Sequence, residues 1–325
     1  MTAPLQQMPV PSDLSAGLFK LSFKALGTHC LVQFRAPGEA AARHFRATAL
    51  SWLRDFEATF SRFIPTSVVS RLNAQAGGAG LDLAPEVERL FELGDWVFSA
   101  SHGINDPSSL PLTRLWDEAA QTQIIPSIQE RTKAQDCVGW EKIERRGGRV
   151  RLPSPGMAVD FGGFGKEFAV DYVLQLAVEQ GIDNILVDLG RDIATCGRPP
   201  GQPVWVVGVE AAAVPDRPVL RAGLSGEAMA SSGNYRRYRV IAGRRFGHLI
   251  DPRTGEPACT EVEGVTCIAQ RCVTAGLFSQ TAFILGVDAG LRLMEAQSGV
   301  EGVVQSPGRL WRTRDFYRYE LPNPV

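Results

Sequence analysis

The sequence has few of the residues that build metal centres and disulfides. Its 325 residues include four histidines and six cysteines. No two cysteines form a C-x-x-C pair, and the closest two, Cys267 and Cys272, do not have the spacing of metal ligands. We therefore expect reduced, buried or half-buried thiols, and the shortage of histidine argues against a histidine-rich metal centre.

An excess of one charge and long hydrophobic runs are also missing. The chain carries 34 basic and 35 acidic residues, so nothing indicates a nucleic-acid footprint. No apolar stretch approaches the roughly 18 residues that a membrane span needs. The first residues lack the basic and apolar segments of a signal peptide. We therefore expect a cytoplasmic protein with no membrane segment and no nucleic-acid partner.

The apolar content, 44% of the residues, is enough for a substantial core. We expect a flexible polar leader over residues 1–16 and a single domain over residues 17–325. Strand and helix patterns cluster instead of alternating, which favours an α+β fold with antiparallel sheets packed with helices. Helical spacing is clearest over residues 39–60, 84–103, 164–180, 272–286 and 288–297. A loop is expected after residue 103. Residues 123–157 are expected to be mixed, with short strands around residues 138–152 and a hairpin at Gly147 and Gly148.

A glycine-rich turn, "DFGGFGKEF", is the first candidate binding element. Gly162, Gly163 and Gly165 let a ligand approach the backbone closely. The helix that follows begins with unpaired N–H groups and a positive dipole end, and Lys166 adds a cation. This combination suits a phosphate or a diphosphate. A tight turn with a surface lysine is the alternative, and the pattern is not a Walker A loop.

Three further polar clusters lie in loops or at helix ends. "GHLIDPRTGEP" contains His248 and Asp251, and its D-P-R-T-G is also a plain turn sequence. "FSRFIPTSVVSRLNA" covers residues 60–74, and "GINDPSSLPLTRLWD" covers residues 103–117. For both of these the alternative is a loop that caps a helix.

From about Lys20 to Trp311, the clusters resemble one family in their order and separation. Together with "LGTHC", "ILVDLGRDI", "SSGNY" and "TAGLFSQTAFILG", they are similar to the FAD:protein FMN transferases, or ApbE-like flavin transferases. The resemblance implies a T-fold-like α+β architecture that binds FAD. It also implies Mg²⁺-dependent transfer of FMN to a Thr or Ser hydroxyl of an acceptor protein, with release of AMP.

The resemblance assigns roles to residues of this chain. Leu26 and Phe63 would line the flavin pocket, where Phe63 replaces the usual tyrosine. Lys166 would face the diphosphate, and His248 or a nearby carboxylate would deprotonate the acceptor hydroxyl. The implied catalytic residues are His248, Lys166 and Asp251. The implied cofactor-binding residues are Leu26, Phe63, Ile104, Asn105, Asp106, Asp160, Gly162, Gly163, Lys166, Arg191 and Leu249.

The metal site departs from the family pattern. The family uses a carbonyl of the glycine turn, here Gly163, with an Asp and a Thr that are Gly276 and Gln280 in this chain. Thr281 is one residue on, rotated by about 100° around the helix. Gly163 and Ser279 remain as candidate ligands. Because Mg²⁺ prefers carboxylate oxygen, we expect the magnesium site to be weak or absent.

Other departures surround the same site. The usual "AKGYA" is "GKEFA" here, and Asp188, Arg191 and Val68 also differ from the family pattern. One hypothesis is that Arg191 neutralises the diphosphate in place of the metal, and the alternative is that it is a surface residue. Transferase activity is the preferred prediction. A flavin-binding protein without transfer and an FAD diphosphatase stay open, and the acceptor is not identified.

Overall fold

The computed structural model describes residues 17–212, 214 and 217–322. The predicted leader, residues 1–16, lies outside the described residues, as do residues 323–325 of the predicted domain. No helix within the described part of the chain is both long enough and apolar enough to cross a membrane.

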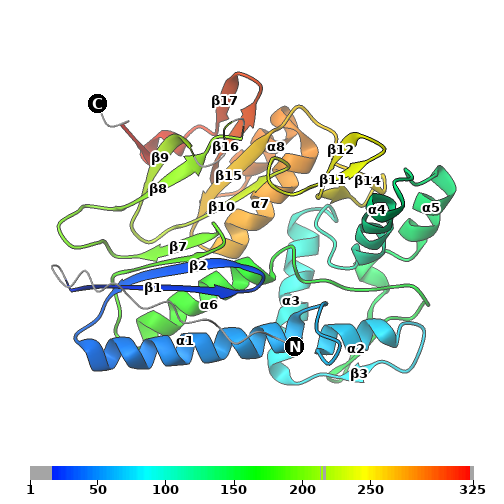
Figure 1. Cartoon of the computed structure of the whole chain (residues 1–325), viewed down its shortest axis with the longest axis horizontal. Coiled ribbons are helices and arrows are strands. Elements are labelled where there is room, and N and C mark those ends of the chain that lie inside the picture. The colour runs from blue at the N-terminus through cyan, green and yellow to red at the C-terminus, as the bar shows by residue number, and fades with distance from the viewer. Residues whose placement is uncertain (1–16, 213, 215–216, 323–325) are drawn as a thin grey trace.

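An eight-stranded sheet forms the centre of the molecule (Figure 1). All of its neighbouring strands pair antiparallel. The hairpin that opens it turns through Leu26 and Gly27, both at positive φ, as a two-residue hairpin turn requires. The strands, in sheet order, are β1 (Leu18–Ala25), β2 (Thr28–Arg35), β6 (Ile185–Leu189), β7 (Ile193–Cys196), β10 (Ala228–Gly233), β15 (Gly264–Ala269), β16 (Glu301–Ser306) and β17 (Arg309–Arg312).

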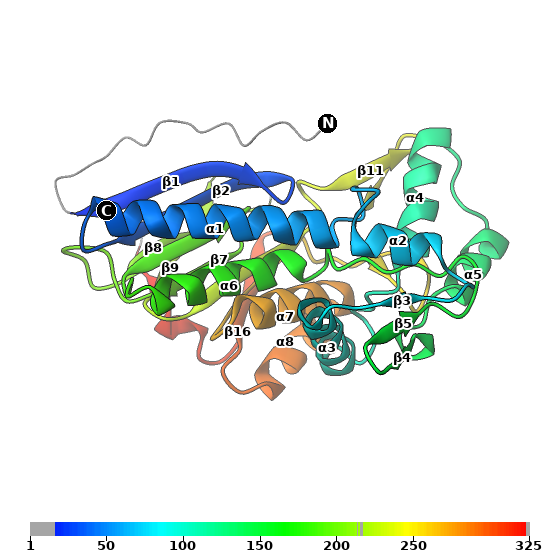
Figure 2. The same ribbon diagram turned by 90° about the horizontal axis from the view of Figure 1, so that it is seen from below.

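Helices cover one face of this sheet (Figure 2). They are α1 (Glu39–Phe60), α6 (Gly165–Glu179), α7 (Cys272–Leu285) and α8 (Val287–Ala296). The opposite face packs on a three-stranded sheet of β8 (Trp205–Glu210), β9 (Pro218–Leu224) and β18 (Glu320–Leu321). Because β15 lies between these two layers, all six of its residues are buried.

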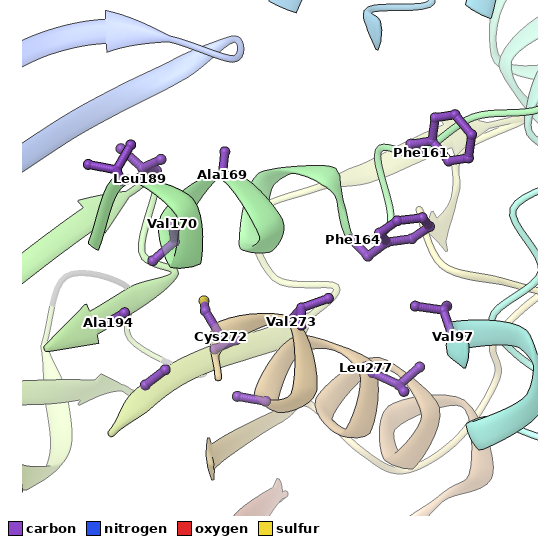
Figure 3. Packing of buried hydrophobic residues seen from close by; sticks show 14 of the residues in the cluster. Val97, Phe161, Phe164, Ala169, Val170, Leu189, Ala194, Cys272, Val273 and Leu277 are labelled. Atoms are coloured by element: carbon purple, nitrogen blue, oxygen red, sulfur yellow. The ribbon is translucent and has the colours of Figure 1, made fainter. Parts of the chain in front are cut away.

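The largest core cluster lies between the sheet and its helices. Side chains of α6 and α7 face each other there, among them Val170, Val273 and Leu277 (Figure 3). Phe161 and Phe164 of the glycine turn also point into this core. Their burial anchors the turn from both sides, so the three glycines lie at a fixed place beside the start of α6.

The remaining elements gather at the other end of the molecule (Figure 1). The helices there are α2 (Val68–Ala74), α3 (Pro85–Ala100), α4 (Leu110–Thr122) and α5 (Ile128–Asp136), with the short helix η2 (Trp140–Lys142) packed on α3. The short helix η3 (Phe316–Arg318) lies against β16 instead. The short strands are β3 (Leu81–Asp82), β4 (Glu144–Arg146), β5 (Arg149–Arg151), β11 (Tyr238–Ile241), β12 (Arg244–Gly247), β13 (Ile250–Asp251) and β14 (Glu256–Pro257).

The α+β class is confirmed, and one local prediction is wrong. The segment expected to be a loop after residue 103 contains α4, in which Pro111 is the second residue, where a missing N–H costs nothing. The mixed segment has the expected short hairpin, formed by β4 and β5, and it also contains α5, which the sequence reasoning did not assign. Ser127 and Glu130 form a capping box at the start of α5 and stabilise it, although the helix has no buried residue.

Candidate functional site

A cleft of about 910 Å³ lies where the glycine turn meets the loops before α2 and α4. Its size is that of a site for a nucleotide or a larger small molecule. Of the site residues predicted from the sequence, the structure brings together Leu26, Phe63, Ile104, Asn105, Asp106, Asp160, Gly162, Gly163, Lys166, Arg191, His248 and Leu249. A second hollow of about 650 Å³ beside Trp140 contains none of them.

Phe63 gives the cleft an exposed aromatic face. Its side chain is 78% exposed, although it lies in the cleft wall. The guanidinium of Arg62 lies 4.4 Å from the ring centre on one side, and its Nε binds Asp160 Oδ2 at 3.0 Å. An aromatic ring held in this way is suited to stack on a planar ligand, with Leu26 and Leu249 as further apolar wall.

The start of α6 forms the anion-binding part of the cleft. The helix begins at Gly165, and no side chain in the described residues caps its first turn. The N–H of Gly162 donates to Asp160 Oδ1 at 2.9 Å, which fixes the turn. Uncapped N–H groups at a helix start attract an anion because they lack partners within the helix.

Lys166 lines the cleft but already has an acidic partner. Its Nζ forms an ion pair with Asp192 Oδ2, a carboxylate that is 4% exposed. Asp192 follows β6, so the pair ties the start of α6 to the end of that strand. Lys166 therefore contributes to the charge of the cleft from a fixed position, with part of that charge offset by Asp192.

Arg191 lies in the same wall, at a backbone φ of +77° that favours glycine. Its Nη1 pairs with Glu210 Oε2, and Glu210 also pairs with Arg236. The side chain is 51% exposed. Neutralisation of a diphosphate by Arg191 stays a prediction, and it would require the guanidinium to be shared with Glu210.

His248 lies in the cleft, and its protonation state is the one that a general base needs. Its Nδ1 lies 3.1 Å from the carbonyl oxygen of Arg237, which only accepts, so Nδ1 carries the proton and Nε2 is left with its lone pair. Burial and the positive charge of Arg237 lower the pKa of His248 to about 4. The imidazole is therefore neutral near pH 7.

Two predicted residues are not brought to the cleft. The carboxylate of Asp251 accepts the backbone N–H of Arg253 at 2.9 Å and pairs with the guanidinium of the same residue at 2.7 Å. The hydroxyl of Ser279 is fully buried, 2.8 Å from Ser232 Oγ and 3.0 Å from the carbonyl oxygen of Gly276. Asp251 therefore stabilises a turn, and Ser279 joins α7 to β10.

Asn105 and Asp106 line the cleft and also hold the loop before α4. Asn105 Nδ2 donates to Thr281 Oγ1 at 2.6 Å, which ties the loop to α7. Asp106 Oδ1 accepts from the N–H of Ser108 at 2.7 Å and from its hydroxyl at 2.6 Å. Burial raises the pKa of Asp106.

The sequence reasoning assigned no role to Glu167, which also lines the cleft. Its side chain lies against Gly276 of α7, where an added Cβ would be 2.8 Å from Glu167 Cγ. Gln280 Nε2 donates to the carbonyl oxygen of Gly163 at 2.5 Å and to Glu167 Oε1 at 3.4 Å. The sequence did hold a signal for this contact: relative to the family pattern, the chain has an acidic residue at position 167 and a glycine at position 276.

The fold and the cleft define an α+β protein with a cleft of nucleotide size, which combines an uncapped helix start with an exposed aromatic face. The chain belongs to the ApbE family, whose family model matches residues 26–304. It is 27% identical over 301 residues to the FAD:protein FMN transferase of Treponema pallidum, covering 87% of this chain and 83% of that protein. It is 26% identical over 280 residues to the enzyme of the same name from Vibrio cholerae, covering 85% and 84%.

Solved structures of the family have the same fold. The ApbE protein of Thermotoga maritima superposes with a TM-score of 0.84 at 26% identity, over 94% of this chain and all of that one. The flavin transferase ApbE of Vibrio cholerae has a TM-score of 0.81 at 22% identity, over 94% and 99%. The flavin transferase architecture predicted from the sequence is therefore confirmed.

Proposed function

We propose that this protein is an FAD:protein FMN transferase, which moves FMN from FAD to a Thr or Ser hydroxyl of an acceptor protein and releases AMP. One observation carries the proposal. The exposed ring of Phe63, the start of α6 with Lys166, and the neutral His248 lie in one cleft. The names of relatives that align over most of their length support it.

The cleft divides into parts that match the parts of FAD. The isoalloxazine would stack beside Phe63, between Leu26 and Leu249. The diphosphate would lie at the start of α6, where N–H groups and Lys166 offset its charge. The bridging oxygen between the two phosphorus atoms would then lie on the side of the cleft that His248 lines.

The reaction is a displacement at phosphorus. The acceptor oxygen attacks the FMN phosphorus, the bond from that phosphorus to the bridging oxygen breaks, and AMP leaves with the bridging oxygen. His248 Nε2 takes the proton of the attacking hydroxyl, because it is the unprotonated ring nitrogen. Positioning and charge neutralisation supply most of the remaining rate.

The residues present fit a divalent cation such as Mg²⁺ beside the diphosphate. Glu167 Oε2 is buried without a hydrogen-bond partner in the described residues, and the carbonyl oxygen of Gly163 lies nearby. Glu167 and Gly163 would hold the cation, which when bound neutralises charge that develops on the phosphates. Among the described residues no three His, Cys, Asp or Glu side chains converge, so the nucleotide itself would complete the coordination.

The test uses FAD, the purified protein and an acceptor domain that carries a flavinylation threonine. We expect the acceptor to gain the mass of FMN and AMP to appear in equal amount. His248→Gln should retain FAD binding and lose most of the transfer. AMP without a labelled acceptor would indicate a diphosphatase, and bound FAD without either product would indicate a flavin-binding protein. The cytoplasmic location stays a prediction.

A further inference from the structure

A buried carboxylate in the cleft wall lacks the partner that burial demands. Glu167 is 5% exposed, and its Oε2 forms no hydrogen bond with any described residue. An unpaired carboxylate oxygen away from water is unfavourable, so native proteins rarely leave one without a partner or a bound ligand. The side chain belongs to the wall of the same cleft as the glycine turn, so the unpaired oxygen lies directly behind the surface that a ligand there would contact.

The neighbouring helix is shaped around this side chain. At Gly276 of α7 an added Cβ would lie 2.9 Å from Glu167 Oε1 and 2.8 Å from Glu167 Cγ, closer than Cβ atoms normally approach. Any other residue at 276 would displace the carboxylate. A glycine inside a helix is normally unfavourable, so its presence here is consistent with a requirement for the room it leaves.

Other oxygen donors lie beside the carboxylate. The carbonyl oxygen of Gly163 and Glu167 Oε1 both accept from the same atom, Gln280 Nε2, at 2.5 and 3.4 Å. That amide nitrogen therefore lies between two oxygens, as a cation would. Rotation of the amide by half a turn exchanges Nε2 with Oε1 and supplies a third oxygen.

The acids beside Glu167 already have partners, and Asp171 also faces the guanidinium of Arg271 at 3.6 Å. Lys166 is paired with Asp192, so it does not neutralise Glu167 alone. The carboxylate of Asp171, also on α6, is occupied by the N–H groups of Cys272 and Val273 at 2.6 and 3.1 Å. Glu167 is thus the carboxylate of this group that still has an oxygen to offer.

We propose that Glu167 binds a divalent cation of the Mg²⁺ class, together with the carbonyl oxygen of Gly163 and the amide oxygen of Gln280, and that Gly276 leaves room for this carboxylate. The carboxylate is supplied by α6 and reaches the site across the space that Gly276 leaves open. This inference rests on the proposed function in one respect: the phosphates of bound FAD complete the coordination.

The experiment measures cation binding directly. Mn²⁺ is titrated into the protein–FAD complex and free Mn²⁺ is followed by its electron paramagnetic resonance signal. We expect one bound Mn²⁺ per chain, displaced by Mg²⁺. Glu167→Gln should weaken Mn²⁺ binding by more than about tenfold. Glu57→Gln is the matched control, because Glu57 lines the same cleft from α1 and its substitution removes the same charge. The Glu57→Gln variant should bind Mn²⁺ with nearly the affinity of the wild type.

A second variant restores the carboxylate from the other helix. In Glu167→Gly/Gly276→Asp the new side chain points into the space vacated by Glu167, so we expect Mn²⁺ binding to return. Urea midpoints check that each variant is folded. Equal Mn²⁺ affinity in wild type and Glu167→Gln, or equal losses in Glu167→Gln and Glu57→Gln, would overturn the inference.

Failure of the inference differs from failure of the proposed function. Full FMN transfer in EDTA would refute the cation site and leave the transferase intact. Mn²⁺ binding that depends on Glu167, without any labelled acceptor, would support the cation site and contradict the transferase. FAD binding is confirmed beforehand by quenching of flavin fluorescence in each variant.

Discussion

The substitution Gly276→Ala tests the packing of α6 against α7 without any ligand. In an ordinary helix interior, alanine is about 1 kcal/mol more stable than glycine. Here the new Cβ would lie 2.8 Å from Glu167 Cγ and 2.9 Å from Glu167 Oε1. Glu167 is itself only 5% exposed. Overpacking of a buried site costs about 1–3 kcal/mol. We therefore expect a net loss of about 0–2 kcal/mol, where alanine would usually stabilise.

The control is the same substitution in a Glu167→Ala background. Removing the carboxylate removes the contact, so Gly276→Ala should then stabilise by about 1 kcal/mol. The coupling energy between the two sites should be about 1–3 kcal/mol. Urea unfolding followed by circular dichroism measures the free energy of unfolding of the four proteins, with the slope checked for constancy.

Additivity would refute the reasoning. If Gly276→Ala stabilises the wild type as much as it stabilises the Glu167→Ala protein, the two side chains do not share space. The proposed route of a carboxylate from α6 to the cation would then fail as well, because it depends on the same contact.

Three further outcomes follow from the site. Phe63→Ala should weaken FAD binding by about tenfold, because it removes a stacking surface, and unchanged affinity in a fluorescence titration would contradict this. The pKa of His248, lowered to about 4, means that the unfolded chain takes up the proton first. Its contribution to stability is present above pH 6.5 and is lost as the pH falls toward 4, so the stability difference between wild type and His248→Gln should change over that range. A pH-independent difference would be inconsistent with a half-buried His248 that stays neutral. Lys166→Met leaves Asp192 buried without its partner and should cost about 3–5 kcal/mol in urea unfolding, and a loss below about 1 kcal/mol would argue against the pair.

The sequence determined most of the local backbone. Helical spacing correctly placed α1 over residues 39–60, and the glycine pair at 147 and 148 correctly placed the hairpin of β4 and β5. These patterns succeed because they reflect contacts within one element, three or four residues apart in a helix and opposite one another in a hairpin. The prediction failed at α4 because it interpreted Pro111 as a sign of a loop. A proline in the first turn of a helix is in fact well tolerated.

Motif order predicted which residues share the cleft. The glycine turn, Phe63, Asn105 and His248 come from distant segments, yet the structure brings them to one wall. No local pattern gives the directions of their side chains, however. Asp251 lies in a motif of the same kind but turns to Arg253, and Ser279 turns into the core against Ser232.

The tertiary structure alone decided how the charges pair. Three contacts join different segments of the chain: Lys166 pairs with Asp192, Arg191 pairs with Glu210, and Glu167 packs against Gly276. Which side chains meet depends on how α6 packs on α7 and on the sheet, and that packing is set by the whole core and not by spacing along one helix. The sequence therefore determined which chemical groups are present, and the packing decided which of them can reach a ligand.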